Sequence, residues 1–259
     1  MKMYKYAVIM FNFNNYETFK EPLELDPDCE YVYVTDNTKL KSNKWKIIVD
    51  NSLNGKLVFE KCFYVRYNLF KYTNAPVAIY MDGSFQIYKS LKPIYDSFIE
   101  SNADLGICIH PYRNEIFAEY TTWVNTRNYP VENVKKVMKI MAELNYPTHY
   151  KGLYQAGMRI CKNTELNKTI DTEVFKTLKK LSTPNSFERL DQTIYSIILN
   201  SKYENKIKIF PFAQQVFQSN LIRWKIHGTN KNHSAPLGNY KTGYVFNKEV
   251  NLFNLIDLI

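Results

Sequence analysis

The sequence predicts an α/β protein with a mostly parallel sheet and helices on both faces. Strand-like and helix-like segments alternate along the first half of the chain, as in doubly wound sheets. The 259 residues are 45% hydrophobic, which is enough for a sizeable core. No internal repeat, low-complexity segment or Gly/Ser linker divides the chain. We therefore expect a single domain over residues 1–259.

The first half contains short apolar runs rich in β-branched and aromatic residues, which are typical of buried strands. One longer segment instead spaces Val58, Cys62, Val65 and Leu69 as on one face of a helix. The expected strands are Tyr6–Phe11, Tyr31–Thr35, Lys46–Val49, Val77–Met81 and Asp104–Ile109, and the expected helices are Leu57–Lys71 and Pro93–Ser101.

The second half is more helical and less regular. Residues 225–243 are rich in Gly, Asn, His and Lys and predict a loop. Val250–Ile259 is amphipathic, which predicts packing on the body of the protein or, alternatively, contact with a membrane surface. The expected helices are Glu115–Thr126, Val131–Leu144, Thr172–Leu181 and Ser186–Leu199, and Gly152–Cys161 is an expected strand.

Charge and composition narrow the class of protein. The net charge of +9 permits an anionic ligand, although the Lys residues are dispersed rather than gathered in a tract. The first residues lack a signal-peptide pattern, and no apolar run approaches the roughly 18 residues of a membrane span. Four dispersed cysteines do not form a zinc motif. We expect a cytoplasmic protein, with the inner membrane surface as an alternative location.

The segment Pro76–Ile87 is the most informative. A buried strand ends there at Asp82, Gly83 and Ser84. A carboxylate at the carboxyl end of a strand lies where open α/β sheets bind ligands. Oxygen ligands at such a place suit Mg²⁺ or Mn²⁺, which bridge carboxylates to substrate phosphates. An ordinary Asp-Gly turn is the alternative interpretation of this segment alone.

Other polar residues follow predicted strands or begin predicted helices. They are expected to meet at one edge of the sheet. Arg66 on its helix is a candidate phosphate ligand, and the pair Asp191 and Gln192 opens a helix that favours anions at its start. The remaining candidates are Phe11, Asn12, Asp36, His110, Arg113, Glu119, Arg189, His227, Lys231 and His233.

Taken in order, these motifs resemble a known family over about residues 6–200. The matching segments are 14–17 (Asn-Asn-Tyr-Glu), 21–22 (Glu-Pro), 33–37 (Tyr-Val-Thr-Asp-Asn), Trp45, Arg66, Lys71, 80–87, 110–113 (His-Pro-Tyr-Arg), Glu119, 152–155 (Gly-Leu-Tyr-Gln), Arg159 and 189–192 (Arg-Leu-Asp-Gln). Together they resemble the DUF616 family of glycosyltransferase-like proteins. That family is in turn similar to GT-A glycosyltransferases, above all the retaining enzymes of family 8.

The resemblance implies a GT-A-like fold and roles for particular residues. Asp82 matches the first acid of an Asp-x-Asp metal motif, with Ser84 in place of the second acid. His227 or His233 is the implied further metal ligand, for Mn²⁺ or Mg²⁺. Asp191 and Gln192 match a pair that faces the donor sugar. The implied catalytic set is Asp191, Gln192, Glu119 and Arg113, and the implied nucleotide-sugar set is Phe11, Asn12, Asp36, Arg66, Asp82, Gly83, Ser84, His110, Arg189 and Lys231.

The function that the resemblance implies is transfer of a sugar from a nucleotide diphosphate sugar, with a UDP-sugar favoured, to a glycan or lipid-linked acceptor. Residues 1–115 form the implied nucleotide-sugar half and 116–259 the acceptor half. The amphipathic stretch Val250–Ile259 adds peripheral membrane association as a further expectation, and no nucleic-acid partner is expected. Two alternatives stay open. One is a nucleic-acid-binding protein, suggested by the pI near 9.1 and 21 Tyr residues. The other is a non-catalytic GT-A-like binding module, suggested by Ser84.

Overall fold

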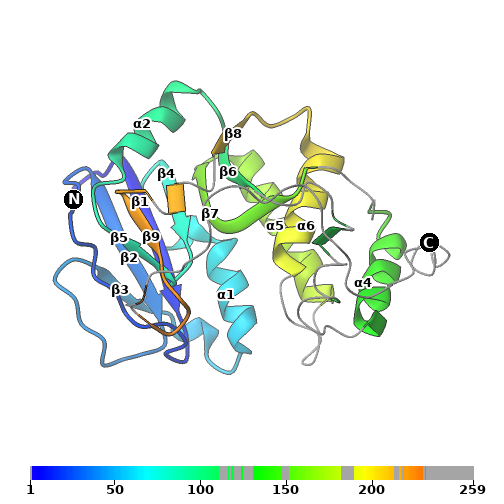
Figure 1. Cartoon of the computed structure of the whole chain (residues 1–259), viewed down its shortest axis with the longest axis horizontal. Helices are drawn as coiled ribbons and strands as arrows, with labels where there is room; N and C mark the ends of the chain where they lie inside the picture. Colours follow the sequence, from blue (N-terminus) through cyan, green and yellow to red (C-terminus); the bar gives the residue numbers. More distant parts are fainter. Residues whose placement is uncertain are drawn as a thin grey trace.

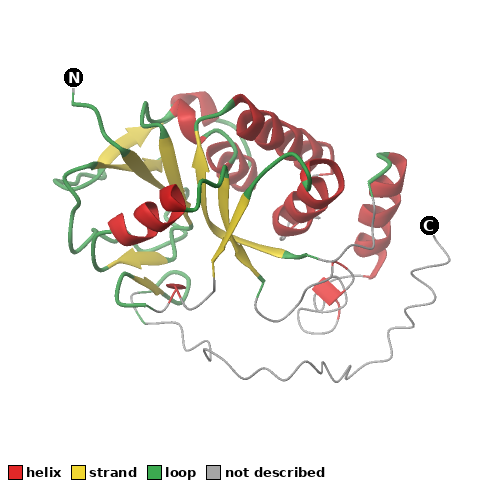
Figure 2. Ribbon diagram, turned by 90° about the horizontal axis from the view of Figure 1, so that it is seen from above, coloured by secondary structure: helices red, strands yellow, loops and turns green. Residues whose placement is uncertain are grey.

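The computed structural model describes residues 2–110, 131–146, 152–181, 190–212 and 219–229, together with Ile116, Ala118, Glu119, Val124, Val216, Phe217 and Lys231. In this part of the chain the predicted fold class is confirmed, because a seven-stranded sheet carries helices on both faces (Figures 1 and 2). The expected helix Glu115–Thr126, apart from a few single residues, and the amphipathic stretch Val250–Ile259 lie outside the described residues.

The strands of the main sheet lie in the order β3-β2-β1-β4-β7-β6-β8. All described neighbours pair in parallel except β7, which is antiparallel to both β4 and β6. The strands are β1 (Tyr6–Asn12), β2 (Cys29–Thr35), β3 (Lys46–Val49), β4 (Val77–Met81), β6 (Leu105–Ile109), β7 (Tyr154–Lys162) and β8 (Ile209–Phe212).

Helices cover both faces because the central strands are apolar on both sides. Every residue of β1 is buried, and its side chains alternate between two core clusters. One face packs against α2 (Lys92–Glu100), and the other packs against helices that include α1 and α5. α4 lies at the end of the molecule opposite β3 (Figure 1). The other helices are α1 (Val58–Arg66), α4 (Val131–Glu143), α5 (Glu165–Leu181) and α6 (Leu190–Ile198).

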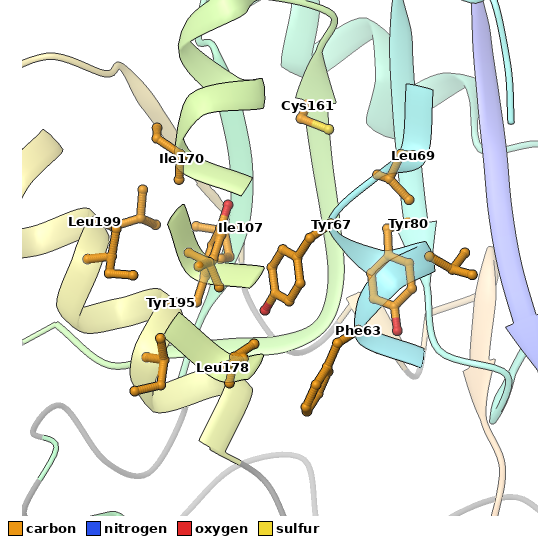
Figure 3. Close-up of a cluster of buried hydrophobic side chains, with 14 of the residues drawn as sticks. Phe63, Tyr67, Leu69, Tyr80, Ile107, Cys161, Ile170, Leu178, Tyr195 and Leu199 are labelled. Carbon is orange, nitrogen blue, oxygen red and sulfur yellow. The ribbon is translucent and has the colours of Figure 1, made fainter. Parts of the chain in front are cut away.

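Aromatic side chains fill the core beneath α1, α5 and α6. Figure 3 shows Tyr67 between Tyr195 on one side and Tyr80 with Leu69 on the other. The rings of Tyr67 and Tyr195 are 5.9 Å apart at their centroids. Tyr67 and Tyr80 are both buried, so this core surrounds the polar groups that the last residue of α1 and the end of β4 bring together.

Several element boundaries differ from those predicted. The helix expected over Leu57–Lys71 ends at Arg66, because Asn68 leaves helical geometry and its side-chain amide donates to the Tyr64 carbonyl at 2.8 Å. A separate 3₁₀ turn then covers Leu69–Lys71. The helix expected from Thr172 instead begins at Glu165, after Thr164, whose hydroxyl accepts from the Asn167 amide at 3.2 Å as an N-terminal cap.

Three short strands have no counterpart among the predicted elements. β5 (Phe85–Ile87) and β9 (Ile222–Trp224) form an antiparallel pair beside the main sheet, and β8 extends the sheet at its edge. Three residues, as in β5 and β9, are too few to display a strand period in the sequence, and β8 contains Pro211, which weakens its strand signal. No helix in the described residues is long and apolar enough to cross a bilayer.

Phe98 anchors α2 to the sheet. It is fully buried, and a Cβ at Gly106 on β6 would lie 3.3 Å from its ring. The neighbouring Ile99 is 40% exposed on the outer face of the same helix. Substituting each of the two residues therefore distinguishes the contribution of packing to stability from that of helix formation.

We predict that Phe98→Ala lowers the free energy of unfolding by about 3–5 kcal/mol, through lost burial and the cavity that remains. The matched substitution Ile99→Ala should change it by less than about 1 kcal/mol. Urea denaturation of both variants measures the difference. Equal effects would contradict the docking of α2 through Phe98.

Candidate active site

The candidate site lies at the carboxyl edge of the sheet. β2 and β3 lie on one side of β1, and β4 lies on the other, so the strand order reverses between β1 and β4. Open α/β sheets bind ligands at such a switch point, outside the carboxyl ends of the strands. The residues that follow β1 begin at Phe13, and Asp82 directly follows β4. Both segments therefore border the expected position of a ligand.

Asp82 has one fixed and one open carboxylate oxygen. Its Oδ1 accepts from Arg66 Nη2 at 2.7 Å and also from the Tyr80 hydroxyl. Its backbone amide donates to the Gly157 carbonyl on β7 at 2.9 Å. Among the described residues no hydrogen bond engages Oδ2, and the side chain is 32% exposed. One oxygen is thus held in place while the other remains available to a ligand.

Arg66 joins two carboxylates from distant parts of the chain. Its Nη1 forms an ion pair with Asp191, the second residue of α6, and its Nη2 also donates to the Tyr80 hydroxyl at 2.7 Å. Burial lowers the pKa of Arg66, but Tyr80 and Asp82 raise it more, so the pKa stands above its usual value. The predicted role of Arg66 as a phosphate ligand stays a prediction, since its observed partners are protein groups.

A second buried ion pair, between Arg159 and Asp171, fixes the backbone of Arg66. Arg159 on β7 pairs with both oxygens of Asp171 on α5, with Nη2 at 2.8 Å from Oδ2. The same Nη2 donates to the backbone carbonyl of Arg66. Its Nη1 donates to the Tyr195 hydroxyl at 3.2 Å. Arg159 therefore fixes the end of α1 where Arg66 must stand to reach Asp82.

The turn after Asp82 fits closely beneath the end of β1. A Cβ at Gly83 would lie 2.7 Å from the carbonyl oxygen of Phe11, closer than real Cβ contacts, so a glycine is needed there. The buried Lys20 ammonium donates to the Gly83 carbonyl at 3.2 Å. Ser84 is also buried, and its carbonyl accepts from the Lys225 amide at 2.9 Å.

His227 belongs to a turn that contacts the loop after β1. Its Nδ1 pairs with the buried carboxylate of Glu17, whose other oxygen accepts from the Gly228 amide at 2.9 Å. The hydrogen bond that Glu17 accepts from His227 raises the pKa of His227, burial opposes this, and the nearby charge of Asp82 adds to the rise. The predicted Lys231 is exposed, and its backbone carbonyl accepts from the Ile226 amide at 2.9 Å to close the turn.

Asp36 lies at the end of β2 and has partners different from those of Asp82. Its Oδ2 accepts from Lys61 Nζ at 2.9 Å and its Oδ1 from the Asn14 amide at 2.9 Å. Burial raises the pKa of Asp36, but Lys61 and Asn14 lower it more, so the pKa lies below its usual value. Asn12 fixes the same loop, because its Oδ1 accepts a hydrogen bond from the Glu17 amide and its Nδ2 donates one to the Glu17 carbonyl.

Gln192 joins α6 to a buried acid. Its Nε2 donates to Glu119 Oε1 at 3.1 Å, and its Oε1 accepts from the Ala156 amide on β7 at 3.4 Å. His110 follows β6, is buried, and donates its backbone amide to the Leu153 carbonyl at 2.9 Å. The predicted residues Arg113, Arg189 and His233 lie outside the described residues.

The described donors offer a partial site for a divalent cation. Asp82 supplies an open oxygen, and no hydrogen bond in the described residues engages Nε2 of His227. Among the described residues, no group of three His, Cys, Asp or Glu side chains is arranged to hold a metal. Such a site fits an ion bound by two protein ligands and completed by substrate phosphates and water. The implied metal therefore stays a prediction.

Sequence reasoning missed several residues that shape this edge. Tyr80 on β4 stands two positions before Asp82, which directly follows the strand, so the strand period places both side chains on one face. Glu17 lies within a matching motif but received no role. Lys20, Lys61 and Asp171 carry no local signal, because the partners that give them a place at this edge, Gly83, Asp36 and Arg159, lie 63, 25 and 12 residues away along the chain.

No family model matches the chain, and no curated protein matches it. Among solved structures, the chain is similar to mouse xyloside xylosyltransferase 1 in its apo form, at 11% identity and a TM-score of 0.43, over 80% of this chain and 84% of that one. It is also similar to the glycosyltransferase GlyE of Streptococcus pneumoniae TIGR4, at 10% identity and a TM-score of 0.40, over 82% of this chain and 45% of that one. The resemblance to DUF616 stays a prediction.

We predict that Asp171→Asn lowers the free energy of unfolding by about 3–5 kcal/mol, because it leaves the buried Arg159 charge without its carboxylate. Asp96→Asn, which removes an exposed pair with Lys92, should leave stability almost unchanged. Chemical denaturation monitored by circular dichroism compares the two. A loss for Asp171→Asn no larger than that for Asp96→Asn would contradict the role of the buried pair.

We also predict that Asp36 stabilises the fold in a pH-dependent manner. Because folding lowers its pKa, the stabilisation is fully present above the ordinary Asp value of about 3.9 and is lost as the pH falls through the lower folded-state value. The melting temperature of wild type should exceed that of Asp36→Asn at pH 7, and the gap should shrink towards pH 2. A gap that stays constant would refute the ionic role of Asp36.

Proposed function

We propose that this protein is a GT-A-like glycosyltransferase that transfers a sugar from a nucleotide diphosphate sugar, with a UDP-sugar favoured, to a glycan or lipid-linked acceptor. The observation that carries the proposal is the pair of carboxylates, Asp82 and Asp191, joined by Arg66 at the switch point of the sheet. Carboxylates held in this way accept hydrogen bonds from sugar hydroxyls, and their geometry is set before any ligand arrives.

The same pair suits the charge that develops during glycosyl transfer. The anomeric carbon gains positive charge in an oxocarbenium-like transition state, while the departing diphosphate gains negative charge. Fixed carboxylates beside the sugar stabilise the positive charge without reorganising. Asp191 is assigned this role, and Gln192 is assigned to orient the sugar from the same helix. Asp82, on the other side of Arg66, is assigned to the ion at the departing diphosphate. Retention of the anomeric configuration stays a prediction, which rests on the likeness to family 8.

The departing diphosphate requires cationic partners. Asp82 and His227 would hold Mn²⁺ or Mg²⁺, and His233 is the other predicted ligand. When bound, such an ion acts as a Lewis acid on phosphate oxygens. Lys231, exposed at the turn that carries His227, is assigned to the outer phosphate. Phe11 and Asn12 at the end of β1 border the nucleotide, and His110 and Glu119 border the acceptor side.

The proposal predicts that the protein releases nucleoside diphosphate from a nucleotide sugar and that Asp82 is needed for this. Asp82→Asn should lower the rate on the order of 100-fold or more, because it removes the charge of the carboxylate that is assigned to the ion at the departing diphosphate. The assay screens UDP-sugars with and without Mn²⁺ by thermal shift and then measures UDP release. Turnover separates catalysis from binding alone.

Asp28→Asn is the matched control for this experiment. Asp28 is exposed to a similar degree, with 39% of its side chain accessible, and pairs with Lys5 away from the switch point. It should keep full activity. Release of UDP by Asp82→Asn at the wild-type rate, with the melting temperature unchanged, would disprove the assignment.

A further inference from the structure

Glu17 is a buried carboxylate to which the proposed chemistry gives no role. Only 7% of its side chain is exposed. Its Oε2 accepts from the Gly228 amide at 2.9 Å, and its Oε1 pairs with Nδ1 of His227. Asn12 fixes the backbone of Glu17 on both sides, through hydrogen bonds of 2.9 Å to its amide and 2.6 Å from Asn12 Nδ2 to its carbonyl. Glu17 is therefore held rigidly and directed at the turn that carries His227.

The partners of Glu17 decide which ring nitrogen of His227 is available. An ionised carboxylate can only accept hydrogen bonds, so Nδ1 of His227 must carry the hydrogen. In the neutral ring the lone pair then lies on Nε2. No hydrogen bond in the described residues engages Nε2, and 47% of the His227 side chain is exposed. Metal-binding histidines usually have this arrangement, in which one ring N–H donates to a carboxylate and the other nitrogen binds the metal.

Glu17 also touches the turn that follows Asp82. A Cβ at Gly83 would lie 3.2 Å from Cγ of Glu17, so the Glu17 side chain packs closely against the backbone of Gly83. The Thr18 hydroxyl donates to the Gly228 carbonyl at 2.9 Å, and Lys20 donates to the Gly83 carbonyl. The loop after β1 thus links the turn with His227 to the turn with Asp82. A shift of Glu17 would move the two candidate ligands relative to each other.

We propose that Glu17 is the positioning residue that orients His227 to share a divalent cation with Asp82. The inference rests on the proposed function, because the remaining coordination positions are left to diphosphate oxygens and water. In this proposal Glu17 acts through His227 and does not itself contact the substrate. Gly228, at a φ of 69° that favours glycine, completes the arrangement by directing its amide at the second oxygen of the same carboxylate.

The first measurement is Mn²⁺ affinity of the full chain, followed by the electron paramagnetic resonance signal of free Mn²⁺, with Mn²⁺ alone and with saturating UDP. Glu17→Ala should weaken binding about 10- to 100-fold, as expected for a residue behind a metal-binding histidine. Glu17→Gln should lose less, since its amide oxygen still accepts from Nδ1. His227→Ala should lose at least as much as Glu17→Ala.

Asp26→Asn is the matched control. Asp26 is also buried and accepts from Tyr6, Ser90 and the Asp28 amide, but it contacts neither turn of the candidate site. A merely structural role for Glu17 would make Glu17→Ala and Asp26→Asn alike in stability and both unchanged in Mn²⁺ affinity. That result would overturn the inference.

The second measurement determines the tautomer of His227 in the absence of any metal. Two-dimensional ¹⁵N NMR distinguishes the two tautomers of neutral His227. Wild type should show hydrogen on Nδ1, and Glu17→Ala should shift the ring towards hydrogen on Nε2. An unchanged tautomer would overturn the inference. Mn²⁺ affinity that depends on Glu17 in a protein that turns over no nucleotide sugar would instead refute only the proposed function.

Discussion

The buried guanidinium of Arg66 is the constraint on which the candidate site depends. It lies at the end of α1 and meets Asp82 from β4 and Asp191 from α6, so three elements converge on one charge. A cation that is removed from water must be compensated, and here two carboxylates and the Tyr80 hydroxyl compensate it. The geometry of the two acids is therefore a condition of folding as well as of the proposed chemistry.

The surrounding structure supports this charge in successive layers. Arg159 and Asp171 hold the backbone of Arg66, and the rings of Tyr67 and Tyr195 pack against the Arg159 guanidinium. On the other side, the loop after β1 fixes the Asp82-Gly83 turn through Lys20 and Glu17. The rigid part of the site is thus built on helices and strands, while its open atoms face solvent.

Sequence patterns located the acids of this site but not their connections. An apolar run that ends in Asp-Gly placed Asp82 at a strand end, and the alternation of strand and helix patterns in the first half predicted the fold class. The pairing of Arg66 with Asp191 joins residues 125 positions apart, and no local pattern reports such a contact. The direction of β7 and the three-residue strands β5 and β9 were missed for the same reason, because partners elsewhere in the chain define them.

The place of β7 in the sheet also shapes how the chain is made. β4 pairs with β1 along one edge. Its other edge pairs with β7, where Lys162 lies opposite Val77, and β7 is synthesised much later. At ordinary rates of synthesis, the 72 residues between these strands take roughly 4–14 s to emerge from the ribosome. Throughout that interval an apolar strand edge in the middle of the future sheet is without its neighbour, and such edges promote aggregation. The nascent chain should therefore depend on chaperones until its second half is complete.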